Sequence, residues 1–170
     1  MSFLQSESRS IRLKSAFFAC GLLIYSAASS AEPASGPFAG LSGHWSGSGV
    51  VTLTDGSAER LRCKASYALH AGGRTVQQTL RCASESYRVE ISTNVTSEGN
   101  LLTGSWSEAT HNLSGSLSGR ATESDIIANV AGNGFSARIQ VRTHADKQSV
   151  IIQPQGDADI AAVSIGLARV

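Results

Sequence analysis

The sequence is poor in cysteine, in aromatic residues and in charge. Only three of its 170 residues are Cys, 6% are aromatic and 16% are charged. No Cys-x-x-Cys motif occurs, so a thioredoxin-like redox pair is not predicted. The Lys and Arg residues are scattered and the formal net charge is +1, which argues against nucleic acid or an anionic membrane surface as partner. The histidines are too far apart for a metal site, and neither a metal nor another cofactor is predicted. They are His44, His70, His111 and His144.

The first residues of the chain have the pattern of a cleavable signal peptide. Three basic residues precede an apolar run over 15–28, and the small residues Ser29, Ser30 and Ala31 follow it. This run is shorter than the ~20 residues that a membrane-spanning helix needs. We therefore predict a signal peptide over 1–31, a periplasmic or secreted mature protein, and no transmembrane segment in the mature chain.

Removal of the signal leaves Cys63 and Cys82 as the remaining cysteines, which favours a disulfide in an exported protein. The midpoint between them, Gly72-Gly73, is a turn signal. Folding the chain there sets the cysteines opposite each other and gives one apolar and one polar face, as in a half-buried antiparallel pair. A four-residue turn over 71–74 places them at a non-hydrogen-bonded pair, where side chains are closer. Closing this loop should stabilise the fold by roughly 3 kcal/mol.

Alternation of apolar and polar residues continues through the mature chain, interrupted by turns rich in Gly, Asn and Asp. The pattern predicts an all-β fold, an antiparallel up-and-down β-barrel or barrel-like sandwich of about eight to ten strands. A flexible lead over 32–40 is expected to precede a single domain over 41–170. The expected strands are 44–54, 58–70, 75–84, 86–97, 101–109, 113–122, 125–131, 135–143, 148–153 and 159–169.

A Gly-x-Trp tripeptide stands where the first strand begins. This tripeptide, Gly43-His44-Trp45, resembles the mark of the calycin superfamily, which includes lipocalins, fatty-acid-binding proteins and avidins. In that superfamily the Trp packs across the closed end of the barrel and ligands bind in the lumen. The alternative interpretation is that Trp45 and Trp106 are ordinary core residues near the starts of strands.

A second resemblance covers nearly the whole mature chain. It is carried by the segments GHWSGSG, DGSAERLRC, LRCASESY, GSWSEAT, SGRA, FSARI and QSVIIQPQG. These segments look like a family of small exported proteins from Gram-negative bacteria that has no assigned activity. The resemblance implies export and the two cysteines, and it implies no chemistry.

Two function classes remain after these exclusions. The first is a non-enzymatic binding protein that holds a small apolar or amphiphilic ligand in its lumen. Its discriminator is a connected apolar cavity of about 300 Å³ or more. The second is a cell-envelope structural or interaction protein with a filled core and no small-molecule ligand, in which case an envelope protein would be the partner. The residues expected to contact a lumen ligand are Trp45, Leu53, Tyr67, Leu69, Val89, Ile91 and Trp106.

Two further features leave alternatives open. Several strands are built from Gly, Ser and Ala, and such small side chains either leave room in a barrel or permit tight bends in its wall. An enzyme is not predicted, because it would require a carboxylate and an imidazole, such as Glu108 and His111, to converge in a pocket. No catalytic residue is assigned on sequence grounds.

Overall fold

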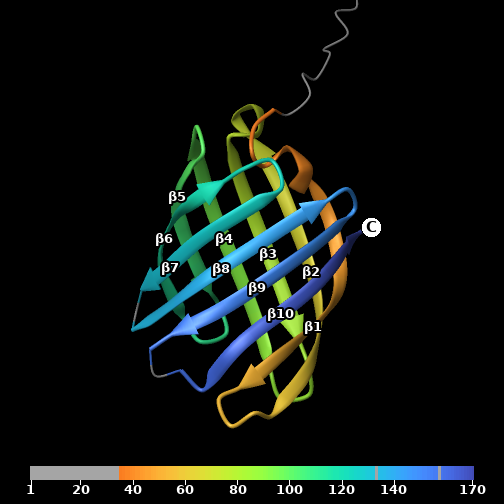
Figure 1. The fold of residues 1–170 in the computed structure, drawn as a ribbon, viewed down its shortest axis with the longest axis vertical. Coiled ribbons are helices and arrows are strands. Elements are labelled where there is room, and N and C mark those ends of the chain that lie inside the picture. The colour runs from red at the N-terminus through yellow and green to blue at the C-terminus, as the bar shows by residue number, and fades with distance from the viewer. Residues whose placement is uncertain (1–34, 133, 157) are drawn as a thin grey trace, which may run out of the picture. The chain divides into compact units, whose positions relative to one another are not determined.

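The computed structural model describes residues 35–132, 134–156 and 158–170. The expected signal peptide over 1–31 lies outside these residues. Ten strands follow one another in chain order around a single sheet (Figure 1). They are β1 (Gly43–Leu53), β2 (Ala58–His70), β3 (Thr75–Ala83), β4 (Arg88–Glu98), β5 (Leu101–Glu108), β6 (Leu113–Ala121), β7 (Asp125–Gly132), β8 (Phe135–His144), β9 (Lys147–Gln155) and β10 (Ile160–Arg169).

Every strand pairs antiparallel with its sequence neighbours, and β10 returns to pair with β1. The ladder that closes the barrel runs from Trp45 opposite Arg169 to Leu53 opposite Ile160. Its register shifts between Thr52 and Leu53, near the end of β1. The sheet is therefore a closed up-and-down barrel, which settles the choice between barrel and sandwich and confirms the predicted fold class. Closure leaves no sheet edge with unpaired backbone groups. Alternate connections lie at the same end of such a barrel.

The β2–β3 hairpin has the predicted register. Cys63 lies opposite Cys82 and forms the disulfide with it, and the two Cα atoms are 4.2 Å apart. That distance is typical of a non-hydrogen-bonded antiparallel pair. His70 pairs with Thr75, so the turn spans four residues, and it contains the short 3-10 segment η2 (Ala71–Gly73). Both halves of the prediction, the bond and the longer turn, are confirmed.

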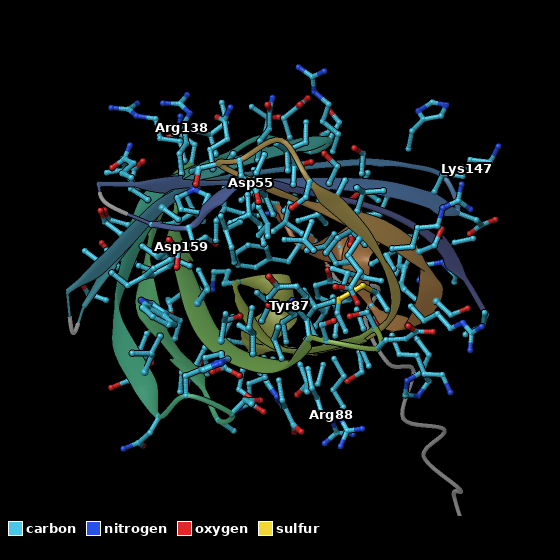
Figure 2. The ribbon with its side chains drawn as sticks, turned by 90° about the horizontal axis from the view of Figure 1, so that it is seen from below. Asp55, Tyr87, Arg88, Arg138, Lys147 and Asp159 are labelled. Carbon is cyan, nitrogen blue, oxygen red and sulfur yellow. A yellow bond between two sulfur atoms is a disulfide. The ribbon has the colours of Figure 1, made fainter. Side chains whose placement is uncertain are left out.

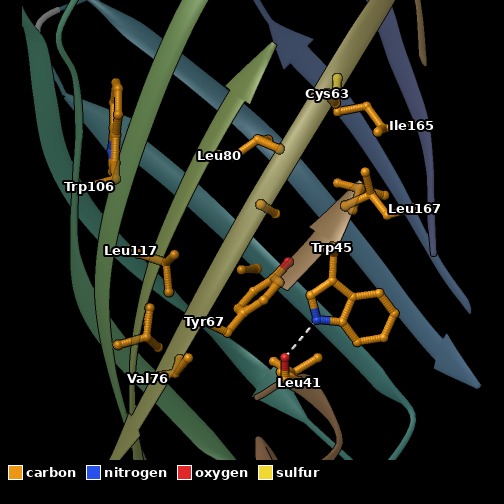
Figure 3. Close-up of a cluster of buried hydrophobic side chains, with 14 of the residues drawn as sticks. Leu41, Trp45, Cys63, Tyr67, Val76, Leu80, Trp106, Leu117, Ile165 and Leu167 are labelled. Carbon is orange, nitrogen blue, oxygen red and sulfur yellow. Dashed lines mark hydrogen bonds between the residues drawn. The ribbon is translucent and has the colours of Figure 1, made fainter. Parts of the chain in front are cut away.

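One end of the barrel is closed by the segment that precedes β1. Phe38 is 1% exposed, and the short 3-10 segment η1 (Ala39–Leu41) presents Leu41 to the core. The Trp45 indole donates its Nε1–H to the Leu41 carbonyl over 2.8 Å (Figure 3). The Arg169 guanidinium lies 4.3 Å from the centroid of the indole ring. Arg169 also donates to the carbonyls of Ser42 and Gly40.

Of the flexible lead expected over 32–40, residues 35–40 are among the described residues and 32–34 lie outside them. From Ser35 onward the segment lies against the barrel, and the Ser35 N–H donates to the Gly72 carbonyl over 3.1 Å. The physical reason is Phe38, an apolar side chain that is stabilised by burial in the core at this end of the barrel. Trp45 takes the place at the closed end that the calycin resemblance implied.

Several glycines of the strands lie where the backbone of a neighbouring strand approaches closely. A Cβ atom built on Gly104 would lie 2.9 Å from the Val95 Cα and closer still to the Asn94 carbonyl oxygen. Comparable backbone clashes would arise at Gly47, Gly115, Gly119 and Gly132. Neighbouring strands thus approach these positions more closely than any side chain allows. In the described part of the chain, no helix is long and apolar enough to cross a membrane.

Candidate functional site

The barrel interior contains two neighbouring cavities. The larger has a volume of about 270 Å³ and lies toward the end opposite η1, and the smaller, of about 100 Å³, lies beneath Phe38 and Leu41. Figure 2 views the barrel from the end of the larger cavity, with Tyr87 on the inner side of the ring of strands. Five residues line both cavities, so the two are separated by little more than side chains. The shared residues are Leu80, Ile91, Thr93, Ile139 and Ile152.

The wall of the larger cavity is almost entirely apolar. Its aliphatic and aromatic residues come from all parts of the barrel, including Leu61, Val130, Phe135 and Ile160. Polar atoms enter this wall from Tyr87, Thr93, Trp106, Glu108 and His111. An apolar chamber with a few converging polar groups is the usual form of a small-molecule site.

The residues predicted to contact a ligand lie in the larger cavity, in the smaller cavity or outside both. Val89, Ile91 and Trp106 line the larger cavity, and Tyr67 lines the smaller one. Leu53 and Leu69 pack against the core, and Trp45 belongs to the closed end. None of these last three lines either cavity.

Glu108, the last residue of β5, is the buried acidic group of the site. Its inward position follows from the two-residue alternation of the strand, which also turns Trp106 inward. Its side chain is 7% exposed. One carboxylate oxygen accepts the backbone N–H of Glu90 over 3.1 Å and of Thr110 over 2.9 Å, and the other accepts the His111 N–H over 2.7 Å.

These bonds set the charge of the carboxylate. Burial alone would raise the pKa of Glu108, but the backbone N–H groups of Glu90, Thr110 and His111 outweigh it and lower the pKa to about 2. Glu108 is therefore ionised across the physiological range. A buried anion is tolerated here because donors surround it.

His111 is brought to the same carboxylate by the loop over 109–112. Glu108 pairs with Leu113, so the loop reverses the chain in four residues, and Asn112 takes the left-handed conformation with a φ of 55°. Asn adopts this conformation more readily than most residues. The imidazole Nδ1 then lies 2.8 Å from the Glu108 Oε2. The structure thus brings together the carboxylate and imidazole whose convergence the sequence could not show.

Trp106 carries the other unusual polar atom of the cavity. The residue is 6% exposed, and its indole packs edge-on against Phe135 with ring centroids 5.7 Å apart. In the described part of the chain, its Nε1 is the buried side-chain nitrogen that has no hydrogen-bond partner. Leaving such a donor unpaired costs about 1–3 kcal/mol.

Unlike the Trp106 Nε1, the buried polar side chains near the closed end are hydrogen-bonded to one another. The Tyr67 hydroxyl donates to the Gln148 Oε1 over 2.7 Å, and the Gln148 Nε2 donates to the Thr143 Oγ1 over 3.1 Å. Burial raises the pKa of Tyr67 well above its ordinary value, so its hydroxyl stays protonated as the donor. Across the described ranges no cluster of three or more His, Cys, Asp or Glu residues could hold a metal ion.

Comparison with solved structures places this barrel among known ones. The structure of Rv2717c from M. tuberculosis superposes with a TM-score of 0.62 at 12% identity, covering 77% of this chain and 93% of that one. The S-type phycobiliprotein lyase CPES from Guillardia theta superposes with a TM-score of 0.55 at 11% identity, covering 78% of this chain and 90% of that one. No protein-family model and no curated protein matches the sequence. At these identities the likeness concerns the fold, and it is consistent with the calycin-like barrel.

Proposed function

We propose that the protein is a non-enzymatic binding protein that holds a small apolar or amphiphilic molecule inside its barrel. The observation that carries this proposal is the apolar cavity of about 270 Å³ next to a second one of about 100 Å³. Neither cavity alone reaches the volume of about 300 Å³ that was set above as the discriminator and at which ligand pockets generally begin. The larger one falls slightly below it, so the ligand is expected to be small.

The expected place of action is an oxidising compartment, the periplasm or the cell exterior. The Cys63–Cys82 bond supports this assignment, because structural disulfides persist in such compartments and are rare in the cytosol. The pattern predicted as a signal peptide over 1–31 points the same way. We expect the protein released from the periplasm to carry the bond already formed.

A matched pair of Ile→Trp variants tests the binding proposal. Ile139 lines both cavities, whereas Ile127 is 37% exposed on the outer surface of the neighbouring strand β7. Residues 32–170 are titrated with the neutral probe N-phenyl-1-naphthylamine, whose fluorescence rises in an apolar site. Ile139→Trp should abolish the saturable signal, because the indole occupies the lumen, and Ile127→Trp should retain it. Equal loss or equal retention in both variants would contradict binding in the lumen.

Glu108 and His111 provide the observation that favours a second candidate, an acid–base reaction on a molecule in the lumen. A carboxylate that orients an imidazole leaves the second ring nitrogen able to take a proton. The discriminating experiment is native mass spectrometry of the protein isolated without denaturation. A bound molecule that is recovered chemically unchanged after incubation supports binding. Conversion that stops in His111→Phe supports the reaction.

A further inference from the structure

The open end of the barrel holds an imidazole with one ring nitrogen already engaged. His111 lines the larger cavity while 64% of its side chain remains exposed, so it lies at the mouth. The Glu108 carboxylate that meets its Nδ1 is ionised and can only accept. The Nδ1 must therefore carry the hydrogen, and in the neutral imidazole the Nε2 then has a lone pair and no hydrogen.

This orientation is fixed rather than incidental. The same carboxylate accepts the backbone N–H groups of Thr110 and His111, which hold the loop in place. A hydrogen bond to one ring nitrogen sets the tautomer and the orientation of an imidazole. Within the described residues, no hydrogen bond engages the Nε2 of His111. An acceptor is thus presented at the entrance of an apolar chamber.

The surroundings of the mouth decide which head group suits that acceptor. The five connections at this end span 54–57, 84–87, 109–112, 133–134 and 156–159, and none of them contains Lys or Arg. Exposed carboxylates stand in three of them, at Asp55, Glu85 and Asp159. Arg88 begins β4 and is directed away from the barrel interior (Figure 2). A negatively charged head group would therefore be repelled by these carboxylates, and no Lys or Arg of these connections would attract it.

We propose that the lumen takes an apolar molecule ending in a hydrogen-bond-donating head that is uncharged or cationic, a hydroxyl or an ammonium group, which the Nε2 of His111 accepts. This inference rests on the proposed lumen-binding function and specifies its ligand class. The apolar part fills the cavity, and the donor head stays at the mouth. A carboxylate head is excluded by its charge and by its lack of a hydrogen to donate.

A ten-carbon series tests the head group directly. Residues 32–170 at pH 8 are titrated with 1-decanol, decylamine, decyl methyl ether and decanoate in competition with N-phenyl-1-naphthylamine. The ether keeps the chain and an acceptor oxygen but has no donor. We expect the alcohol or the amine to bind ~3- to 10-fold more tightly than the ether, the range of one net hydrogen bond, with decanoate weakest. Tighter binding of the alcohol would indicate a neutral head group, and tighter binding of the amine would indicate a cationic one.

A matched pair of His→Phe variants assigns the effect to one residue. His111→Phe keeps a ring at the mouth and removes the acceptor, so the preference for the alcohol or the amine over the ether should disappear. His144 ends β8 at the opposite end of the barrel, and His144→Phe should retain the preference. Tightest binding of decanoate, or a preference that survives in His111→Phe, would overturn the inference and leave lumen binding standing. Failure of all four compounds to displace the probe would overturn both.

Discussion

Replacement of Gly104 by Ala should destabilise the barrel far more than the same change at Gly166. Both glycines lie within strands, β5 and β10. A Cβ on Gly104 would stand 2.9 Å from the Val95 Cα, whereas a Cβ on Gly166 would meet nothing within 4 Å. Carbon atoms pack at about 3.5–4.0 Å, so roughly 1 Å of backbone displacement is required between β4 and β5. No rotamer change can relieve a contact between a Cβ and the backbone.

The magnitude follows from the cost of overpacking. Inserting a methyl group where the backbone must move costs typically about 1–3 kcal/mol and occasionally more, and the backbone contact places Gly104→Ala at about 2–3 kcal/mol. For a domain of this size each kcal/mol lowers the melting temperature by roughly 3–4 °C, so a decrease of about 6–12 °C is expected. Gly166→Ala should fall near zero or gain up to about 1 kcal/mol through the unfolded chain.

Urea unfolding of residues 32–170, followed by far-UV circular dichroism, measures both variants against the parent. The midpoint should drop for Gly104→Ala with an unchanged slope, because the slope reports the surface exposed on unfolding. If the two variants have equal stability, the close approach of β4 to β5 is not what requires glycine at position 104. The interpretation that glycine is needed where neighbouring strands approach closely would then be wrong.

Two other predictions concern the polar groups of the interior. The pKa of Glu108 lies near 2 in the folded chain against 4.5 ordinarily, so its ionised form contributes about 3 kcal/mol of stability above pH 4.5 that is lost as the pH falls toward 2. Glu108→Gln should therefore be less stable than the parent at pH 7 and should lose less stability between pH 4.5 and 2. Urea titrations in which the two proteins differ by the same amount at every pH would refute this. Trp45→Phe should cost at least about 1 kcal/mol more than Trp106→Phe, because only the Trp45 indole donates a hydrogen bond, to the Leu41 carbonyl; equal melting temperatures would contradict it.

The fold was predictable because its determinants are local. Two-residue alternation marks each strand, and glycine-containing turns such as Gly72-Gly73 mark where the chain reverses. Cys63 and Cys82 fix the register of the β2–β3 hairpin, since a slip of one residue would turn the cysteines to opposite faces. Barrel closure is different, because it depends on the register of β1 against β10, residues far apart in the chain. Nothing in either strand alone distinguishes that pairing from an open sandwich.

The lining of the cavity was predictable only in part. Alternation correctly turns Val89, Ile91 and Trp106 inward, but it turns Leu53 and Leu69 inward as well. Whether an inward residue meets a cavity or another side chain depends on its height along the barrel axis and on the residues across the lumen. The sequence of one strand contains neither. Glu108 and His111 were visible as neighbours in the chain, yet their contact depends on the left-handed Asn112.

The two ends of the lumen differ in how their polar groups are satisfied, and this difference gives the cavity a direction. Near the closed end, Tyr67 and Gln148 hydrogen-bond to each other and leave nothing for a ligand. At the open end, the Trp106 indole nitrogen lacks a partner in the described part of the chain, and His111 presents a ring nitrogen to the mouth. Buried polar groups of natural proteins are normally paired. A molecule that enters with its apolar part first and keeps its polar end at the mouth places that end where the unengaged groups are. A hydroxyl head can both donate to the His111 nitrogen and accept from the Trp106 indole, whereas an ammonium head can only donate. The reverse orientation would bury the polar end against Tyr67 and Gln148, which already hydrogen-bond to each other.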